Sequence, residues 1–335
     1  MTIKGGNMEK TFWHPVALID SVLGEAVSVQ LLGVEVVLWR DNTGQVHAWL
    51  DQCPHRGAKL SLGRVCDNRL QCPYHGWTFQ TDGKCVNIPS APSFSPPISH
   101  AVKVFIAQEA YGLVWVCLDM EKSFLTKPPV FAAEEHVDLL KVMCGPYDVA
   151  TSGPRVVENF LDMAHFSFVH DGWLGNASHA QIDDYEVITT DTGLIANHCK
   201  VLQPKSHASA STSSWVEYTY EVTSPYTAVL KKESHEGITN AGIHKESIAL
   251  FICPITSELS RVWFRLAVSD LNADATELVS FQTNIFKQDQ PILESQNPKC
   301  LPLKIDFNVH TLADKASTAY RRYLKKIGVS FGVIQ

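Results

Sequence analysis

Residues 53–77, CPHRGAKLSLGRVCDNRLQCPYHGW, gather metal-binding side chains into one short stretch. Cys53 and His55 form a Cys-x-His pair, and after sixteen intervening residues Cys72 and His75 form a Cys-x-x-His pair. Zinc takes thiolate and imidazole ligands in tetrahedral sites, so a Cys2His2 zinc site is one interpretation. Zinc fingers, however, pair Cys with Cys and His with His. Because each arm here carries one of each, the pattern favours two sulfide-bridged irons, one held by the thiolates and the other by the imidazoles.

This stretch resembles the Rieske [2Fe–2S] motif. The resemblance extends beyond the four ligands to Pro54, Arg56, Gly57, Pro73, Tyr74, Gly76 and Trp77. It implies that Cys53, His55, Cys72 and His75 bind a [2Fe–2S] cluster. Two neutral imidazoles in place of two thiolates lower the negative charge of such a cluster and raise its reduction potential.

Composition restricts the class of protein. The chain has 335 residues, 45% of them hydrophobic, and a formal net charge of −7, so it lacks the basic surface that nucleic-acid binding requires. The first residues lack the apolar segment of a signal peptide, and no run approaches the ~18 apolar residues of a membrane span. We expect a soluble, cytoplasmic protein that binds no membrane. The seven cysteines outside the motif are then expected to be reduced, buried thiols: Cys66, Cys85, Cys117, Cys144, Cys199, Cys253 and Cys300.

The first third of the chain has the pattern of an all-β domain. Residues 26–50 are rich in β-branched residues and contain a turn signal at 41–44, and residues 111–118 form a buried-strand run. Four prolines exclude regular structure across 89–97. The Pro128–Pro129 step is the best boundary, which gives a cluster-binding domain over residues 8–128.

The remainder, residues 129–335, has a different pattern. Residues 156–170 have helical spacing, and four segments alternate like strands of one antiparallel sheet: 184–202, 214–232, 246–256 and 260–270. Two helices are expected near the end, at 276–296 and 311–327. The chain is therefore predicted to be α+β, with a helix-grip-like second domain in which helices cover one side of the sheet.

A second group of possible metal ligands lies in the helical segment. Asp162 and His165 are three residues apart and would share a helix face, with His170 within a half-turn arc or just beyond the helix end. Two histidines and a carboxylate form the facial triad of non-haem Fe(II) oxygenases. Taken alone, the spacing is also compatible with a helix that simply packs these residues against a core.

Residues 158–170 resemble the iron-binding helix of Rieske non-haem iron oxygenases. The resemblance is strengthened because this segment follows a Rieske motif, in the order in which the two motifs occur in that family. The alpha-only branch, typified by vanillate O-demethylase and dicamba monooxygenase, is the most similar. The resemblance implies that His165 and His170 bind a mononuclear Fe(II), and that Asp162 connects the two metal centres. A carboxylate can hold the second ring nitrogen of a metal-bound histidine, which agrees with that role. Asn159 matches a polar position of the family.

The third iron ligand must be a carboxylate from elsewhere. The candidates are Asp289, Glu294, Asp306 and Asp314. The family places an aspartate near the C-terminus, followed some eight residues later by arginine, and Asp314 with Arg321 and Arg322 fits this pattern. Asp314 is therefore favoured and Asp306 is second, although an acid at a helix N-terminus would explain Asp314 without a metal. Both arginines are expected at the surface or at an interface.

The resemblance also implies partners. The sequence has no GxGxxG after a strand, so electrons are expected from a separate NAD(P)H-dependent reductase, with or without a ferredoxin. In this family the cluster of one subunit serves the iron of its neighbour in a head-to-tail ring, so we expect a homotrimer. A pure electron carrier would leave the second domain unexplained.

For the substrate, residues 111–118, 170–175 and 320–333 resemble the saxitoxin-pathway Rieske hydroxylases of cyanobacteria. That likeness implies O₂-dependent hydroxylation of a C–H bond in a guanidinium alkaloid. The alternative is an aromatic hydroxylase or an O-demethylase. Acidic or aromatic groups around the iron would favour the cation, whereas a basic residue would favour a carboxylate substrate.

Overall fold

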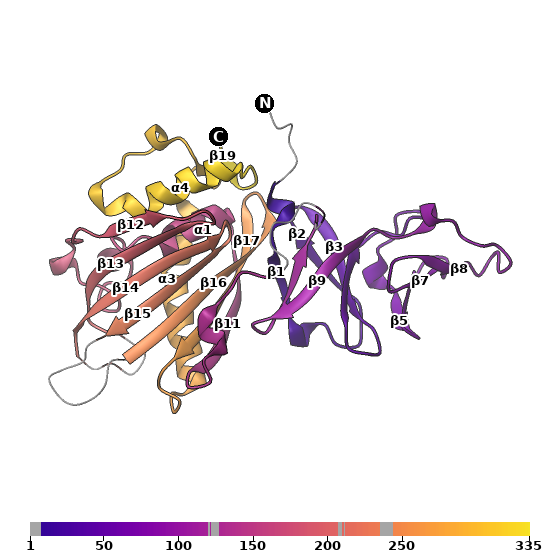
Figure 1. The fold of residues 1–335 in the computed structure, drawn as a ribbon, viewed down its shortest axis with the longest axis horizontal. Helices are drawn as coiled ribbons and strands as arrows, with labels where there is room; N and C mark the ends of the chain where they lie inside the picture. The colour runs from indigo at the N-terminus through magenta and orange to yellow at the C-terminus, as the bar shows by residue number, and fades with distance from the viewer. Residues whose placement is uncertain (1–7, 120, 122–126, 207–209, 211, 235–243) are drawn as a thin grey trace. The chain divides into compact units, whose positions relative to one another are not determined.

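The computed structural model describes residues 8–119, 121, 127–206, 210, 212–234 and 244–335. The chain divides into two compact units (Figure 1). The smaller is Lys10–Pro128, and the larger is Pro129–Gln335, with which Glu9 also packs. The carboxylate of Glu9 accepts hydrogen bonds from the backbone N–H groups of Ser330 and Phe331. Residue 9 therefore belongs with the larger unit, whereas the sequence-based span of 8–128 put it in the smaller one.

The described part of the smaller unit contains strands and short 3₁₀ turns but no α-helix. Its strands are β1 (His14–Leu18), β2 (Val27–Leu31), β3 (Val34–Arg40), β4 (Val46–Leu50), β5 (Arg64–Cys66), β6 (Arg69–Gln71), β7 (Thr78–Gln80), β8 (Cys85–Asn87), β9 (Val104–Ala110) and β10 (Leu113–Cys117). They form a six-stranded sheet, ordered β1-β10-β9-β4-β3-β2, and a four-stranded sheet, ordered β5-β6-β7-β8. The predicted all-β character is confirmed, and no strand lies within residues 89–97.

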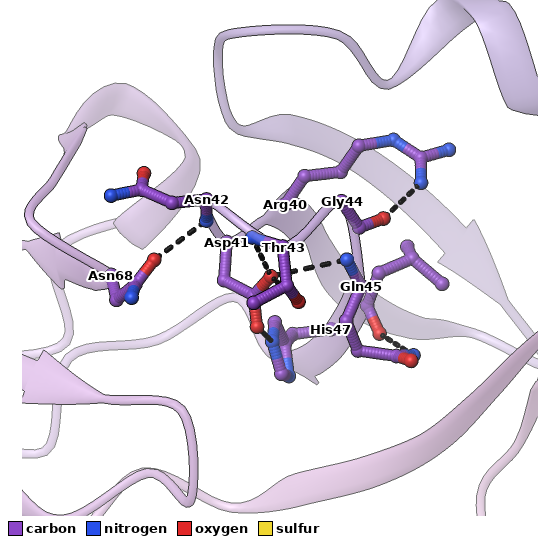
Figure 2. A network of polar contacts seen from close by, with 9 residues as sticks. Arg40, Asp41, Asn42, Thr43, Gly44, Gln45, His47 and Asn68 are labelled. Carbon is purple, nitrogen blue, oxygen red and sulfur yellow. Dashed lines mark hydrogen bonds and ion pairs between the residues drawn. The ribbon is translucent and has the colours of Figure 1, made fainter.

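A polar network closes the β3–β4 hairpin at the predicted turn (Figure 2). Asp41 Oδ1 accepts hydrogen bonds from the Thr43 N–H at 2.9 Å and the Thr43 hydroxyl at 2.6 Å, and Asp41 Oδ2 lies 2.9 Å from His47 Nε2. The Asn42 N–H donates to Asn68 Oδ1, which lies in the β5–β6 turn. The Thr43 and His47 hydrogen bonds lower the pKa of Asp41 to about 2. The network therefore ties this hairpin to the small sheet that leads into Cys72.

The described part of the larger unit contains one long antiparallel sheet and four α-helices. The strands are β11 (Leu140–Val149), β12 (Glu186–Thr189), β13 (Leu194–Gln203), β14 (Ser214–Ser224), β15 (Thr227–Ser234), β16 (His244–Thr256), β17 (Leu259–Val268) and the short pair β18 (Leu301–Pro302) and β19 (Val333–Ile334). The helices are α1 (Gly153–Phe160), α2 (Phe166–Val169), α3 (Ala275–Ser295) and α4 (Lys315–Ile327). The seven-stranded sheet runs β11-β17-β16-β15-β14-β13-β12. The α+β prediction is confirmed, although the sequence pattern did not reveal β11.

Strand alternation builds the core of this unit. On β14 the side chains of Val216, Tyr218, Tyr220 and Val222 are buried, while Trp215, which precedes them, points to the other face and is exposed. Helices α1, α3 and α4 add buried side chains to the same core. Helix α3 contacts β11, and α4 contacts β12 and β13 (Figure 1). The helices therefore cover one face of the sheet, and their buried side chains complete the core.

The predicted helix over 156–170 is broken. Helix α1 ends at Phe160 and α2 begins at Phe166. Between them, Asp162 Oδ1 accepts a hydrogen bond from the Ala164 N–H at 2.8 Å, a local side-chain bond that competes with the helical ladder. Asp162 and His165 therefore do not share a helix face, and the expectation that they would was wrong.

All nine cysteines are free thiols. Of the seven outside the motif, five are buried as predicted, but Cys66 and Cys300 are only partly buried. Among the helices that the structure describes, none has the length and apolar character needed to cross a bilayer. The cytoplasmic location stays a prediction.

Candidate metal centres

Two loops of the same construction carry the Cys-x-His and Cys-x-x-His pairs. In each loop the cysteine N–H donates to the carbonyl five residues later, at 2.8 Å in both cases. In each, the glycine four residues after the cysteine donates its N–H to the cysteine carbonyl. These glycines, Gly57 and Gly76, have φ of +73° and +70°, a conformation that a residue with a Cβ adopts only with strain. Repeated backbone geometry therefore aims both pairs at one place.

The side chains of these loops are sorted by chemistry. Cys53 and Cys72 are each 2% exposed, whereas His55 and His75 are exposed, with ring centroids 4.6 Å apart. Burial raises the pKa of Cys53 to about 11, and the nearby Cys72 thiol adds to the effect. The Cys53 thiol therefore favours its protonated form in this buried environment, and a bound cation would favour the thiolate instead. A donor set of two inward thiols and two outward imidazoles fits a Rieske cluster, whose irons would supply that positive charge.

In the larger unit, His165, His170 and Asp289 converge. The His165 Nε2 and His170 Nε2 atoms lie 3.2 Å apart, and Asp289 Oδ1 lies 3.3 Å from the first and 3.1 Å from the second. These three atoms form a group that could hold a metal ion. A nearly equilateral triangle of two imidazole nitrogens and one carboxylate oxygen caps one face of a metal ion and leaves the other face open.

Neighbouring side chains fix how the two histidines point. Asp162 Oδ2 lies 3.3 Å from His165 Nδ1, and Gln288 Oε1 lies 2.7 Å from His170 Nδ1. Both partners are acceptors, so each ring would keep its proton on Nδ1 when a metal ion takes the Nε2 lone pair. The carboxylate of Asp289 is held as well, since Asn159 Nδ2 donates to its Oδ1 at 3.4 Å.

The charges of this cluster also call for a cation. Burial lowers the pKa of His165, but its hydrogen bonds to Asp162 and Asp289 outweigh burial and raise it to about 9. Burial raises the pKa of Asp289, yet the contacts with His165 and His170 lower it to about 2. The two carboxylates therefore favour a positive charge in this group of side chains. Without a metal the His165 proton supplies that charge, and a bound divalent iron would supply it instead.

Asp314, the favoured third ligand, does not join this group. Its Oδ2 accepts hydrogen bonds from the backbone N–H and the hydroxyl of Thr311, in a capping box at the start of the C-terminal helical segment. Among the described residues, Asp289 and not Asp314 is grouped with the two histidines, so the geometry favours Asp289 over Asp314, whose helix-start bonds account for it without a metal. Asp306 is exposed, and Glu294 accepts from the Ala150 N–H, so neither replaces it.

The sequence holds a signal for Asp289 that the family pattern obscured. The buried positions of α3 are Leu278, Gln282, Ile285, Phe286, Asp289 and Leu293. They recur at three- and four-residue intervals, so the carboxylate interrupts an apolar stripe where a charge needs a partner. Gln288, which holds His170, was not anticipated and has no comparable signal.

Arg321 is buried, contrary to the surface or interface position expected for it, whereas Arg322 is exposed as expected. The Arg321 Nε donates to Glu158 Oε1 at 2.6 Å, and Arg155 Nη1 donates to Glu158 Oε2 at 3.2 Å. Arg155 and Glu158 both lie on α1, so Arg321 of α4 is the arginine that anchors the helix leading to Asp162 and His165.

A pocket opens from the iron-binding group between α1, α3 and the sheet. Its wall is largely aromatic and aliphatic, with Phe160, Phe264, Phe286 and Leu250 among the lining residues. The enclosed space is about 80 Å³, so a bicyclic ligand enters only if side chains along the wall rotate. A larger groove of about 780 Å³, between β12 and α4, contains none of the candidate ligands.

The pocket wall also contains polar side chains besides the candidate ligands. Gln282 of α3 and the hydroxyl of Tyr220 line it, and the buried Tyr220 hydroxyl has no hydrogen-bond partner among the described residues. Burial holds the pKa of Tyr220 well above its usual range, so the phenol stays protonated. Lys232 of β15 and Glu246 of β16 also line the pocket and form an ion pair at 3.2 Å.

Comparison with known proteins agrees with both centres. The model of the Rieske [2Fe–2S] domain matches residues 12–105, and that of the vanillate O-demethylase oxygenase C-terminal domain matches residues 149–329. The methylxanthine N1-demethylase NdmA of Pseudomonas putida is 32% identical over 327 residues, which cover 94% of this chain and 88% of that protein. The methylxanthine N3-demethylase NdmB of Pseudomonas putida is 30% identical over 332 residues, which cover 95% and 89%.

Solved structures agree with the fold. That of Pseudomonas putida NdmB has a TM-score of 0.81 at 29% identity, covering 96% of this chain and 92% of the other. Dicamba monooxygenase bound to dicamba has a TM-score of 0.79 at 23% identity, covering 96% and 98%, which supports the fold alone.

The chain belongs to the Rieske non-haem iron oxygenases. It is an oxidoreductase of the monooxygenase and demethylase kind, and its cofactors are a [2Fe–2S] cluster and a mononuclear iron.

Proposed function

We propose that this protein removes a methyl group from nitrogen or oxygen of a small, largely aromatic substrate. The observation that carries the proposal is the His165, His170 and Asp289 triangle at the edge of an aromatic-walled pocket. The matched C-terminal family is named for an O-demethylase, and two similar proteins are named N-demethylases. The mononuclear iron, when bound, supplies the activation of O₂.

The reaction inserts one atom of O₂ into a methyl C–H bond, while the other atom leaves as water. It consumes two protons and two electrons from an external donor. The N–CH₂OH or O–CH₂OH product then breaks its bond to the hetero atom, releases formaldehyde and leaves N–H or O–H. The apolar pocket wall binds the ring and excludes water, which brings the methyl group to the iron side.

We assign the cluster to Cys53, His55, Cys72 and His75, and the iron to His165, His170 and Asp289. Asp162 would connect them, since it touches His165 and its side chain remains 29% exposed. The exposed His55 and His75 would reach such a carboxylate in a neighbouring subunit. We therefore infer a homotrimer that takes electrons from a separate NAD(P)H-dependent reductase, with or without a ferredoxin.

Hydroxylation of a guanidinium alkaloid is the second candidate. The aromatic wall and the Glu246 carboxylate favour a cation, which is the sequence-based hypothesis. The Lys232 ammonium beside Glu246 counts against it, because that pair is already neutral.

Turnover distinguishes the two candidates. The purified protein would be supplied with a generic ferredoxin reductase, ferredoxin, NADH and O₂, and offered N-methyl, O-methyl and guanidinium compounds. Demethylation gives formaldehyde and a product lighter by one CH₂, whereas hydroxylation gives a product heavier by one oxygen and no formaldehyde. Formaldehyde from none of the methylated compounds, with oxygen added to a guanidinium compound, would reject the demethylase. NADH oxidation by the chain alone would reject the separate reductase.

A further inference from the structure

We propose that the Lys232–Glu246 ion pair recognises the substrate, and that it selects a neutral compound presenting a carbonyl next to an N–H, as a cyclic amide or urea does. The inference rests on the proposed function and names its substrate class. Lys232 and Glu246 are register partners on β15 and β16, with side chains 4% and 10% exposed. Both line the pocket that also contains His165, His170 and Asp289.

The position of this pair is unusual for two charges. Its neighbours on the same pocket wall, Leu230 and Ile248, are apolar. Two well-packed apolar side chains would be at least as stable there, because both ions lose their hydration on burial. One register position away, Glu233 and Lys245 form a pair of similar length, 3.1 Å, whose side chains are 49% and 59% exposed. The charges of that outer pair are hydrated by solvent, so only the inner pair needs a further explanation.

The inner pair has unused hydrogen-bonding capacity. Within the described chain, the Lys232 ammonium makes one hydrogen bond, to Glu246 Oε2. An ammonium offers three N–H donors and a carboxylate offers lone pairs on both oxygens. The pair therefore presents a donor and an acceptor side by side. A ligand edge with a carbonyl oxygen beside an N–H is the complementary arrangement.

Charge decides against ionic substrates. A guanidinium group would take Glu246 and leave Lys232 unpaired, whereas a carboxylate would take Lys232 and leave Glu246 unpaired. An unpaired buried charge is strongly unfavourable, while a neutral amide edge bonds both partners without separating them. The same pair thus disfavours the two ionic substrate classes, cationic and anionic, that the sequence left open.

Binding of four probes to the full protein, with the cluster oxidised and without reductant, tests the inference by calorimetry. Theobromine is neutral and has an N–H between two carbonyls, and caffeine is the same ring system with that N–H methylated. Methylguanidinium is the cation and 3-methoxybenzoate the anion. We expect theobromine to bind about 10-fold more tightly than each of the others, since a hydrogen bond to a charged group contributes at least that much.

Variants of the two pairs provide the matched comparison. Lys232→Met and Glu246→Gln are each expected to weaken theobromine binding about 10- to 100-fold. Lys232→Met should also turn the preference toward methylguanidinium, and Glu246→Gln toward 3-methoxybenzoate. Lys245→Met and Glu233→Gln, on the outer face, should leave all four affinities within about twofold.

A double variant covers the case in which a single one fails to fold. Lys232→Met with Glu246→Leu leaves no unpaired charge, and it should bind caffeine and theobromine equally. The inference is overturned if theobromine does not bind measurably, if either ion binds the wild type more tightly, or if the inner variants behave like the outer ones. Because no turnover is involved, selective binding without formaldehyde in the separate assay would reject the demethylase alone. Formaldehyde without selectivity would reject this inference alone.

Discussion

The two metal centres of this chain are built in different ways. The candidate cluster ligands lie on two neighbouring loops, each shaped by the same backbone hydrogen bonds, and their histidines are exposed. The candidate iron ligands come from positions 165, 170 and 289 and meet in the interior. The first arrangement forms when its own small sheet folds, whereas the second forms only when α3 packs beside α1. The two centres should therefore fail independently.

The largest test of this independence is Asp289→Ala. We expect the variant to lose the mononuclear iron and more than about 100-fold of its turnover, because even the outer partners of metal ligands contribute 10- to 100-fold. Its visible spectrum and acid-labile sulfide should stay those of the wild type, since no cluster residue is touched. Iron and sulfide analysis, together with formaldehyde assays, would measure both effects.

Asp314→Asn is the matched control, since within the described chain the Asp314 side chain makes only its capping bonds to Thr311. It should keep its iron and lose at most about 1 kcal/mol of stability as a weakened cap. Loss of iron in Asp314→Asn with retention in Asp289→Ala would reverse the assignment.

Asp162→Asn tests the connection between the centres. The amide oxygen can still accept the His165 Nδ1 proton, so iron content should be unchanged. The negative charge that we propose to connect the centres is lost, and we expect steady-state turnover to fall about 10- to 100-fold. Stopped-flow reoxidation of a prereduced cluster, with O₂ and substrate present, would locate the loss in electron delivery. If the variant instead loses iron as Asp289→Ala does, Asp162 only supports His165.

The contrast between the centres also explains what the sequence could predict. The four cluster ligands could be recognised from their spacing in the sequence, because they lie within 23 residues and local turns position them. The His165 and His170 pair could be recognised for the same reason. Asp289 could be recognised only as a carboxylate in an apolar stripe and not as the partner of these histidines, since they lie about 120 residues away in sequence and only tertiary packing joins them.

Secondary structure follows the same rule. The alternation of the long strands and the period of α3 were predictable, because burial on one face imposes them. The break between α1 and α2 was not, because a single Asp162 hydrogen bond overrides an apolar pattern that continues through it. Pairing of Lys232 with Glu246 required the strand register, which the sequence alone does not give.

A smaller effect separates two neighbouring glutamines of α3. Gln288→Leu should lower the affinity for Fe(II) about 10-fold, since His170 loses the acceptor that orients its ring. Gln290→Leu is the control, because its amide bonds Glu294 and the Asp148 carbonyl instead. Competition with a chelator for Fe(II) would compare them. Equal affinities in the two variants would exclude a positioning role for Gln288, and the cluster spectrum should be unchanged in both.

The smallest expected effect lies in the cluster-bearing unit, at Asp41 (Figure 2). Asp41→Asn should lower the free energy of unfolding by about 1–2 kcal/mol at pH 7, because the amide weakens the hydrogen bonds to Thr43 and His47. The folded-state pKa of about 2 is below the usual 3.8, so the carboxylate stabilises the fold fully above about pH 4. That advantage is lost as the pH falls from 4 through 2.

Urea unfolding followed by tryptophan fluorescence at pH 7, 5, 4 and 3 would measure the difference between Asp41→Asn and wild type. The exposed Asp20, replaced in Asp20→Asn, controls for the change in net charge. A difference that stays constant down to pH 3 would mean that the ionised Asp41 contributes nothing. Because the network reaches Asn68 in the turn before Cys72, Asp41→Asn should also hasten loss of the visible cluster absorption. It should leave the mononuclear iron content unchanged, since that site is assembled entirely within the other unit.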